Sequence, residues 1–267
     1  MIWSVRRELW ENRSVYAAPM IVAGVIALAS IGAVRHNLQP NSLASHCELV
    51  AGVLMGTTLL VAIFYCLDAL YGERRDRSVL FWKSMPVSDS TVVLSKMIIP
   101  LVILPVVTFL ITIATQLIML LITSAYLSMH GQSAAALWTL PWLRMTAGLF
   151  HHLLTVHSLY YAPIFGWLLL VSAWAKRLPF LWAFLPLAAI GVIEKIVFNT
   201  SLFAGMLSSR ISGGMNVDPT KESRMMMLLW PSHPLEFLTR PGLWIGLALA
   251  AIFVAGAVRL RRYRDPI

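Results

Sequence analysis

The chain has 267 residues, of which 58% are hydrophobic and only 12% charged, and its mean hydropathy is +0.75. A soluble domain usually has about 25% charged residues, and it cannot absorb repeated runs of roughly 20 residues without a charge, the length that crosses about 30 Å of hydrocarbon. These values exclude a soluble protein and predict an all-α integral membrane protein. The net charge is +9. In a membrane protein such an excess of cations indicates the orientation of the spans, so nucleic-acid binding is not expected.

Residues 2–13 are predicted to form a helix that lies in the membrane interface. Their apolar side chains share one broad arc of a helix: Ile2, Trp3, Val5, Leu9 and Trp10. Arg6 and Arg13 project into this arc, but arginine stems can lie along apolar surface, and tryptophan favours the headgroup level. The alternative is a frayed continuation of the first span. The uncharged run that follows has no convincing cleavage site, so it is expected to be a retained span rather than a signal peptide.

Six segments are apolar enough to cross the membrane, the fifth of them only just, and together they predict a single permease-like domain over residues 1–267. The approximate spans are 15–34, 49–69, 97–124, 153–175, 178–198 and 241–258. Pro100 and Pro105 remove backbone donors in the third span, so a kink or local opening is expected there, and Pro163 has the same effect in the fourth.

The loop cations predict the orientation of the spans. Six spans place both termini on one side of the membrane, together with the loop between the second and third spans. That side holds 14 of the 21 Lys and Arg residues. Because cytoplasmic loops carry the excess of cations, both termini are expected to be cytoplasmic.

The loop between the second and third spans has nearly thirty residues, whereas about 2–8 would connect neighbouring helices. Residues 71–84 suit a helix, with Glu73 four positions before Arg77 in the favourable order, and Pro86 ends it. This helix has no clean apolar face, and it combines Arg, Phe and Trp, the side chains that anchor protein interfaces. The alternative is an ordinary basic loop, which explains the cations but not the aromatic pair or the length. Ser88 and Asp89 are expected to cap the next helix.

The stretch "LYGERRDRSVLFWKSMPVSDSTVVLSK" resembles the same region in the permease subunits of ABC-type-2 exporters, in particular a bacterial branch of that family. The likeness extends more loosely over the whole chain, through six spans, an N-terminal interfacial helix and a long external connection after the fifth span. It implies that this segment is a coupling helix that sits in a cleft of a separate ATPase subunit. The docking residues that it implies are Glu73, Arg74, Arg75, Asp76, Arg77, Ser78, Phe81, Trp82 and Lys83, with Pro86 fixing the turn back.

The resemblance also implies partners and a location. The chain has no G-x-x-x-x-G-K-[ST] phosphate-binding loop, so ATP and Mg²⁺ are expected on the partner ATPase subunit and no cofactor on this chain, which is then a transport subunit and not an enzyme. The family implies a dimer of permeases, with a second copy or a paralogue, in the bacterial inner membrane. Cargo is not determined, since lipids, hydrophobic peptides and amphiphilic toxins would all suit an apolar cavity.

The fifth span is interrupted near its outer end by Glu194 and Lys195. Short or interrupted spans point to functional sites in transporters, but Glu194 lies roughly 24 Å along a helix from Leu178, close to the outer interface. It is expected to end the span as a polar residue, to pair with Lys195 or a neighbouring helix, or to face an external gate. In the family this region dips back into the outer leaflet, and "FNTSLFAGMLSS" and "MMMLLWPSHPLEFL" are candidates for such pieces.

A metal site is not predicted, although the histidines gather on the outer side of the predicted topology. These are His36, His46, His130, His151, His152, His157 and His233. The run "HHLLTVH" lacks the i, i+4 pair that places two ligands on one helix face. Met225, Met226 and Met227 suit soft metal ions, but an apolar dip into the membrane explains them equally well.

Two other classes of function remain as alternatives. A non-transporting membrane scaffold or assembly factor could use residues 71–84 to bind a cytoplasmic partner. An intramembrane hydrolase would need paired carboxylates or a Ser–Lys or Ser–His arrangement within the spans, and no such pair is evident.

Overall fold

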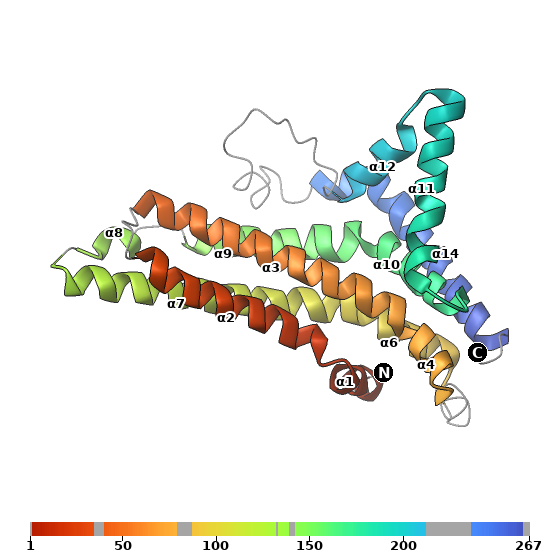
Figure 1. Ribbon diagram of the computed structural model, residues 1–267, viewed down its shortest axis with the longest axis horizontal. Helices are drawn as coiled ribbons and strands as arrows, with labels where there is room; N and C mark the ends of the chain where they lie inside the picture. Colours follow the sequence, from red (N-terminus) through yellow and green to blue (C-terminus); the bar gives the residue numbers. More distant parts are fainter. Residues whose placement is uncertain are drawn as a thin grey trace.

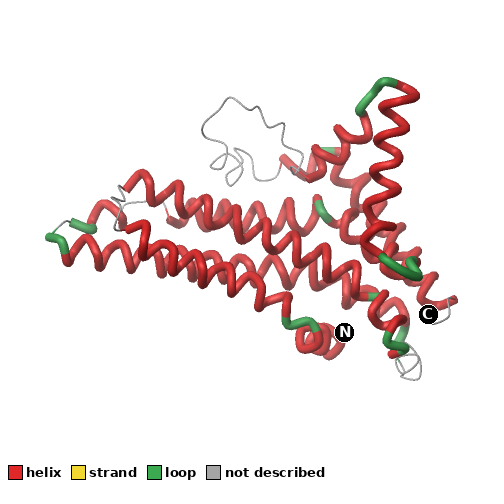
Figure 2. The backbone as a smooth tube through the Cα atoms, viewed as in Figure 1, coloured by secondary structure: helices red, strands yellow, loops and turns green. Residues whose placement is uncertain are grey.

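A computed structural model describes residues 2–34, 40–78, 87–131, 133–138, 142–211 and 236–263, and every regular element in these ranges is helical (Figures 1 and 2). The elements are α1 (Ile2–Glu11), α2 (Ser14–Val34), α3 (Pro40–Ala69), α4 (Tyr71–Arg75), α6 (Asp89–Ile98), the π-helix η1 (Ile99–Ile103), α7 (Leu104–Met129), α8 (Ala135–Trp138), α9 (Trp142–His152), the π-helix η2 (Leu153–Tyr160), α10 (Ala162–Trp174), α11 (Pro179–Phe198), α12 (Leu202–Ile211), the 3₁₀ helix η3 (Glu236–Thr239) and α14 (Pro241–Tyr263).

The chain is built around apolar helices that are long enough to cross a membrane. Four helices meet this condition by length and composition, and up to six do if each of two bent pairs counts as one span. Such helices form because a backbone in hydrocarbon must satisfy its own hydrogen bonds, which a helix does within one segment. The predicted helical membrane architecture is therefore confirmed at this level.

The helices α2, α3, α7 and α10 lie along the long axis of the molecule (Figure 1), and α14 packs closely against α10. The main buried cluster joins α3, α6, α10 and α14, and a smaller one joins α2, α3 and α7. Hydroxyl and amide groups also link α3 to α7: Thr58 bonds to Thr108, and Gln116 donates to the carbonyl of Cys47. Such interhelical hydrogen bonds are typical of helices packed within a membrane.

The N-terminal segment forms its own helix, α1, at 54° to the part of α2 that it precedes. Trp3 and Trp10 are exposed, and the guanidinium of Arg6 lies 5.8 and 5.7 Å from the centroids of their rings. On the other side of α1, Leu9 packs against the main core and Glu8 is buried. The separate helix was predicted, but its inward face is partly polar.

The proline effects predicted from the sequence are present. Around Pro100, η1 forms a π-helical opening between α6 and α7, within one continuous 41-residue helix. Before Pro163, η2 is π-helical, and the axis bends by 44° where α10 begins. A ring without an N–H removes one backbone bond and crowds the carbonyl of the preceding turn, which explains both features.

The helix α11 diverges from the bundle (Figure 1). Ala183 is the only buried residue of this fully described helix. At its far end the chain turns into α12, and the trace then returns through η3 and α14 to the end of the molecule where the N-terminus also lies.

Candidate functional site

Buried charged side chains meet at the end of the bundle where the two termini lie (Figure 1). Four of them come from four different helices: Glu8 of α1, Glu73 of α4, Lys96 of α6 and Arg261 of α14. Their side chains are between 2 and 9% exposed. We call the group formed by Arg7, Glu8, Glu73, Asp89, Lys96 and Arg261 the charge cluster.

Lys96 is the central cation of the charge cluster. Its Nζ lies 2.8 Å from Oε1 of Glu8 and 3.1 Å from Oε1 of Glu73. The hydroxyl of Tyr65, from α3, donates to the other carboxylate oxygen of Glu8 at 3.1 Å. One ammonium group therefore joins the N-terminal helix to α4, and a hydrogen bond extends the connection to α3.

Arg261 is the second buried cation, and it joins α14 to the same carboxylate. Its guanidinium donates to Glu73, and its Nε donates to Oδ1 of Asp89 at 3.1 Å. Arg7 completes the charge cluster at its rim, with ion pairs to Glu8 at 3.1 Å and to Glu73 at 3.6 Å. Three cations face three carboxylates, so the charges balance in a region largely removed from water, where an unpaired charge would be costly.

Local sequence explains how α6 presents its part of the charge cluster. Ser88 is the N-cap, and its Oγ accepts from the backbone N–H of Thr91 at 3.2 Å, as predicted. Asp89 is the first residue of the helix, where a carboxylate is favoured by the helix dipole. Lys96 follows seven residues later, two turns along, so both side chains lie on one face.

Arg74 fastens α4 to the end of α10. Its guanidinium donates to the carbonyl oxygens of Ser172 and Ala175, at 2.8 and 2.7 Å. In return, Oγ of Ser172 accepts the backbone N–H groups of Leu70 and Tyr71, at 3.0 and 2.9 Å. The carbonyls at the end of a helix lack partners within it and carry partial negative charge, so a buried guanidinium satisfies them well.

The structure divides the predicted docking residues into two groups. Glu73 and Arg74 bind other helices of the same chain, so they are not available to a partner. The hydroxyl of Ser78 donates to the backbone carbonyl of Glu73. The exposed members are Arg75, Asp76 and Arg77. The remaining predicted docking residues lie outside the described residues: Phe81, Trp82, Lys83 and Pro86.

The single helix predicted over residues 71–84 is wrong in its extent. The helix α4 ends at Arg75, and Arg77 has a left-handed backbone with φ of 58°. A left-handed residue cannot continue a right-handed helix, so the chain turns at this point. The predicted segment therefore begins with a short helix fixed to the bundle and then changes direction.

Glu194 caps the short helix α12. Its Oε1 accepts from the hydroxyl of Thr200 at 2.8 Å and from the N–H of Leu202 at 2.7 Å, and its Oε2 accepts from the N–H of Phe203 at 2.9 Å. The chain can return to this carboxylate because Asn199 adopts a left-handed conformation that ends α11. Glu194 thus has a structural role as a polar end to the span, and its role in an external gate stays a prediction.

Replacing Glu194 by alanine is expected to loosen α12. Loss of an N-cap destabilises the first turn of the helix, because its backbone N–H groups lose their acceptor. Backbone amide exchange over residues 202–211 should become faster, while the exposed neighbour Lys195, replaced by alanine, serves as the control. Equal protection of α12 in both variants would show that the carboxylate does not hold this helix.

The described histidines lie within or at the end of several helices of the bundle. Within the described ranges, no group of three or more His, Cys, Asp or Glu side chains is placed to hold a metal ion. His157 is buried in η2, with its ring centroid 5.1 Å from that of Tyr161. His36 and His233 lie outside the described residues, as do Met225, Met226 and Met227.

Sequence reasoning missed most of the charge cluster. Glu8, Lys96 and Arg261 were expected only as interfacial or cytoplasmic charges, and no local pattern distinguishes them from exposed ones. Comparison of the chain with protein-family models, with curated proteins and with solved structures finds no match. The charge cluster and its links to the apolar helices are therefore the structural basis for a functional proposal.

Proposed function

We propose that this chain is the membrane permease subunit of an ATP-driven exporter of the ABC-type-2 kind. In this proposal the four long helices and the two bent pairs make six spans, both termini are cytoplasmic, and the protein resides in the bacterial inner membrane. A separate ATPase subunit hydrolyses ATP and grips the segment after the second span. The observation that carries the proposal is the attachment of residues 70–74 to three helices, α10, α6 and α14, through buried polar contacts.

The contacts of α4 suit a mechanical link between a partner and the spans. Arg74 connects it to the end of α10, and Glu73 connects it to α6 and α14 through Lys96 and Arg261. Since α6 continues through η1 into α7, a displacement of α4 would reach three spans at once. Separating α4 from these helices would leave buried charges without partners, at a cost of about 3–5 kcal/mol for a broken pair. A force that a partner applies to α4 is therefore expected to move the attached helices rather than to detach α4 from them.

Exposed groups next to these contacts are available to a partner. Arg75, Asp76 and Arg77 are exposed and precede the aromatic pair Phe81 and Trp82 in sequence. Arginine and aromatic side chains dominate the binding energy of protein interfaces. The nearly unburied, apolar helix α11 also supports a second permease subunit or lipid as a neighbour.

The docking segment is tested by co-expression with an ATPase subunit that carries a phosphate-binding loop and is encoded beside this chain. Replacing both Phe81 and Trp82 by alanine is expected to weaken the co-purified complex at least tenfold, since interface anchors cost about 2 kcal/mol or more when truncated. Charge reversal of Arg75 and Arg77 together should also weaken it. Reversal of Arg13, an exposed cation between α1 and α2, is the matched control.

The outcomes separate the proposal from its alternatives. A complex that forms equally well with all variants would show that the segment is an ordinary basic loop. A complex that depends on the segment, but whose ATPase rate does not respond to any amphiphilic cargo and whose vesicles transport nothing, would favour the scaffold over the exporter.

A further inference from the structure

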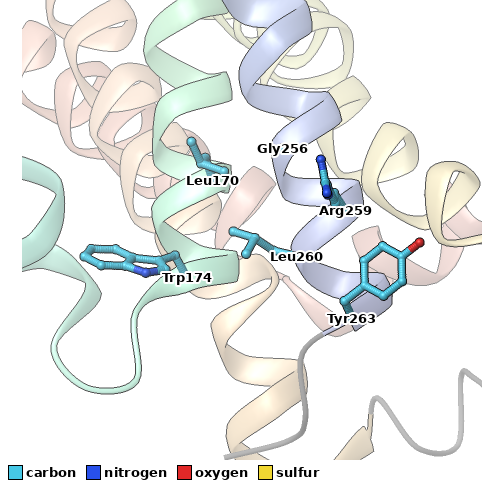
Figure 3. A pocket seen from close by; sticks show the side chains of 6 residues that line it. All are labelled: Leu170, Trp174, Gly256, Arg259, Leu260 and Tyr263. Carbon is cyan, nitrogen blue, oxygen red and sulfur yellow. The ribbon is translucent and has the colours of Figure 1, made fainter.

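A groove of about 650 Å³ lies between α10 and α14 (Figure 3), on the part of α14 that also carries Arg261 of the charge cluster. It is lined by Leu170 and Trp174 of α10 and by Gly256, Arg259, Leu260 and Tyr263 of α14. Its volume is within the range of about 300–1,000 Å³ that ligand sites occupy. Among the described residues of the predicted docking segment, none lines it.

Helical spacing places these residues on facing surfaces. The four residues of α14 have the spacing i, i+3, i+4, i+7, and the two of α10 have the spacing i, i+4, so each set forms one face of its helix. Gly256 lets α14 approach Leu170 of α10 closely, since a Cβ at this position would lie 3.0 Å from Cδ1 of Leu170. The floor of the groove is therefore apolar, with Leu170 and Leu260 along it, as Figure 3 shows.

The rim of the groove differs from its floor. Trp174 and Tyr263 are exposed aromatic side chains, 42 and 73% accessible, at the ends of two apolar helices. Trp and Tyr concentrate at the level of the lipid headgroups in membrane proteins. Arg259 also lines the groove, and its guanidinium is a donor of five N–H groups with no acceptor atom.

Arg259 contrasts with its neighbour Arg261. Arg261 is buried and paired with Glu73 and Asp89, whereas Arg259 is exposed and forms no ion pair with an acidic side chain among the described residues. Two further exposed cations, Lys176 and Arg177, follow α10 in the chain. The groove thus combines an apolar floor and an aromatic rim with nearby exposed cations that form no ion pair with an acidic side chain among the described residues.

We propose that this groove binds an anionic phospholipid of the adjacent leaflet. Its phosphate pairs with Arg259, its glycerol region lies at the level of Trp174 and Tyr263, and an acyl chain lies along Leu170 and Leu260. Basic pockets between membrane-spanning helices are suited to anionic headgroups, because the cation pairs with phosphate while the helices offer apolar surface to the tails. This inference concerns a bound lipid rather than a cargo, and it does not depend on the chain being a transporter.

Native mass spectrometry of the whole chain in detergent tests the proposal, with phosphatidylglycerol and phosphatidylcholine of identical acyl chains as the probes. The wild type is expected to retain one phosphatidylglycerol in preference to phosphatidylcholine. Replacing Arg259 by glutamine should weaken phosphatidylglycerol binding roughly fivefold, the effect of about one cation near an anionic headgroup, and leave phosphatidylcholine binding unchanged. The variant Arg259→Lys should retain most of the preference.

The matched control is Arg262→Gln. Arg262 is also exposed and lies on the same helical turn, but it does not line the groove, and its guanidinium is 5.7 Å from the ring of Tyr263. Unchanged phosphatidylglycerol preference in Arg262→Gln, with loss in Arg259→Gln, supports the site. Equal loss of the phosphatidylglycerol preference in both variants would show that the preference comes from diffuse positive charge, and it would overturn the proposed site. Equal retention of both lipids by the wild type would overturn it as well.

Discussion

Replacement of Lys96 by methionine is expected to lower the free energy of unfolding by about 3–5 kcal/mol, the cost of removing one partner from a buried ion pair. The substitution leaves the carboxylates of Glu8 and Glu73 without their shared cation, 2.8 and 3.1 Å away in the wild type. Titration with sodium dodecyl sulfate, followed by circular dichroism of the purified protein, measures this loss.

Lys195 is the matched control for this prediction, because it is an exposed lysine in an apolar helix. Its replacement by methionine should change the unfolding free energy by no more than about 0.5 kcal/mol. The double variant Glu8→Gln, Lys96→Met should lose less free energy of unfolding than the two single variants lose in sum. The difference, which is the coupling energy of the pair, is expected to be about 0.5–3 kcal/mol. Similar effects of Lys96→Met and Lys195→Met would contradict a buried charge cluster.

Replacement of Arg74 by methionine is expected to lower the unfolding free energy by about 3–6 kcal/mol, because two hydrogen bonds from a charged donor are lost, each contributing about 1.5–3 kcal/mol. The carbonyls of Ser172 and Ala175 would then be left without this donor. Backbone amide exchange at Leu70 and Tyr71, which bond to Ser172, should also become faster.

The neighbouring Arg75 offers a close control, since it is exposed and pairs only with Asp76 among the described residues at 3.1 Å. Arg75→Met should leave the free energy of unfolding nearly unchanged, as expected for a surface ion pair. If the proposed function holds, Arg74→Met should still bind the ATPase subunit but couple its hydrolysis to transport poorly, whereas Arg75→Met should weaken binding. Equal stability losses for the two variants would contradict the attachment of α4 to α10.

Much of the helical architecture could be predicted because its causes are local. Long uncharged runs must form helices in hydrocarbon, and the predicted spans 15–34 and 178–198 agree closely with α2 and α11. The opening at Pro100 depends on the ring of one residue, and the cap at Ser88 depends on a bond to an amide three residues away. Signals of this kind can be read from a short window of sequence.

The candidate site depended on contacts between distant parts of the chain. Arg74 and Arg75 are adjacent residues of the same type, yet one is buried against α10 and the other is exposed, and no local pattern separates them. The end of α4 before Arg77 also conflicts with the local preference for a longer helix.

The sequence by itself determined that this is a helical membrane protein, where its apolar helices lie, and where prolines interrupt them. Only the tertiary structure decided which charges are buried, because a charge can leave water only where an opposite charge meets it. Glu73 and Arg261, 188 residues apart, meet through the packing of α4 against α6 and α14. That packing converts a basic loop into a part of the molecule that is firmly joined to the helices crossing the membrane.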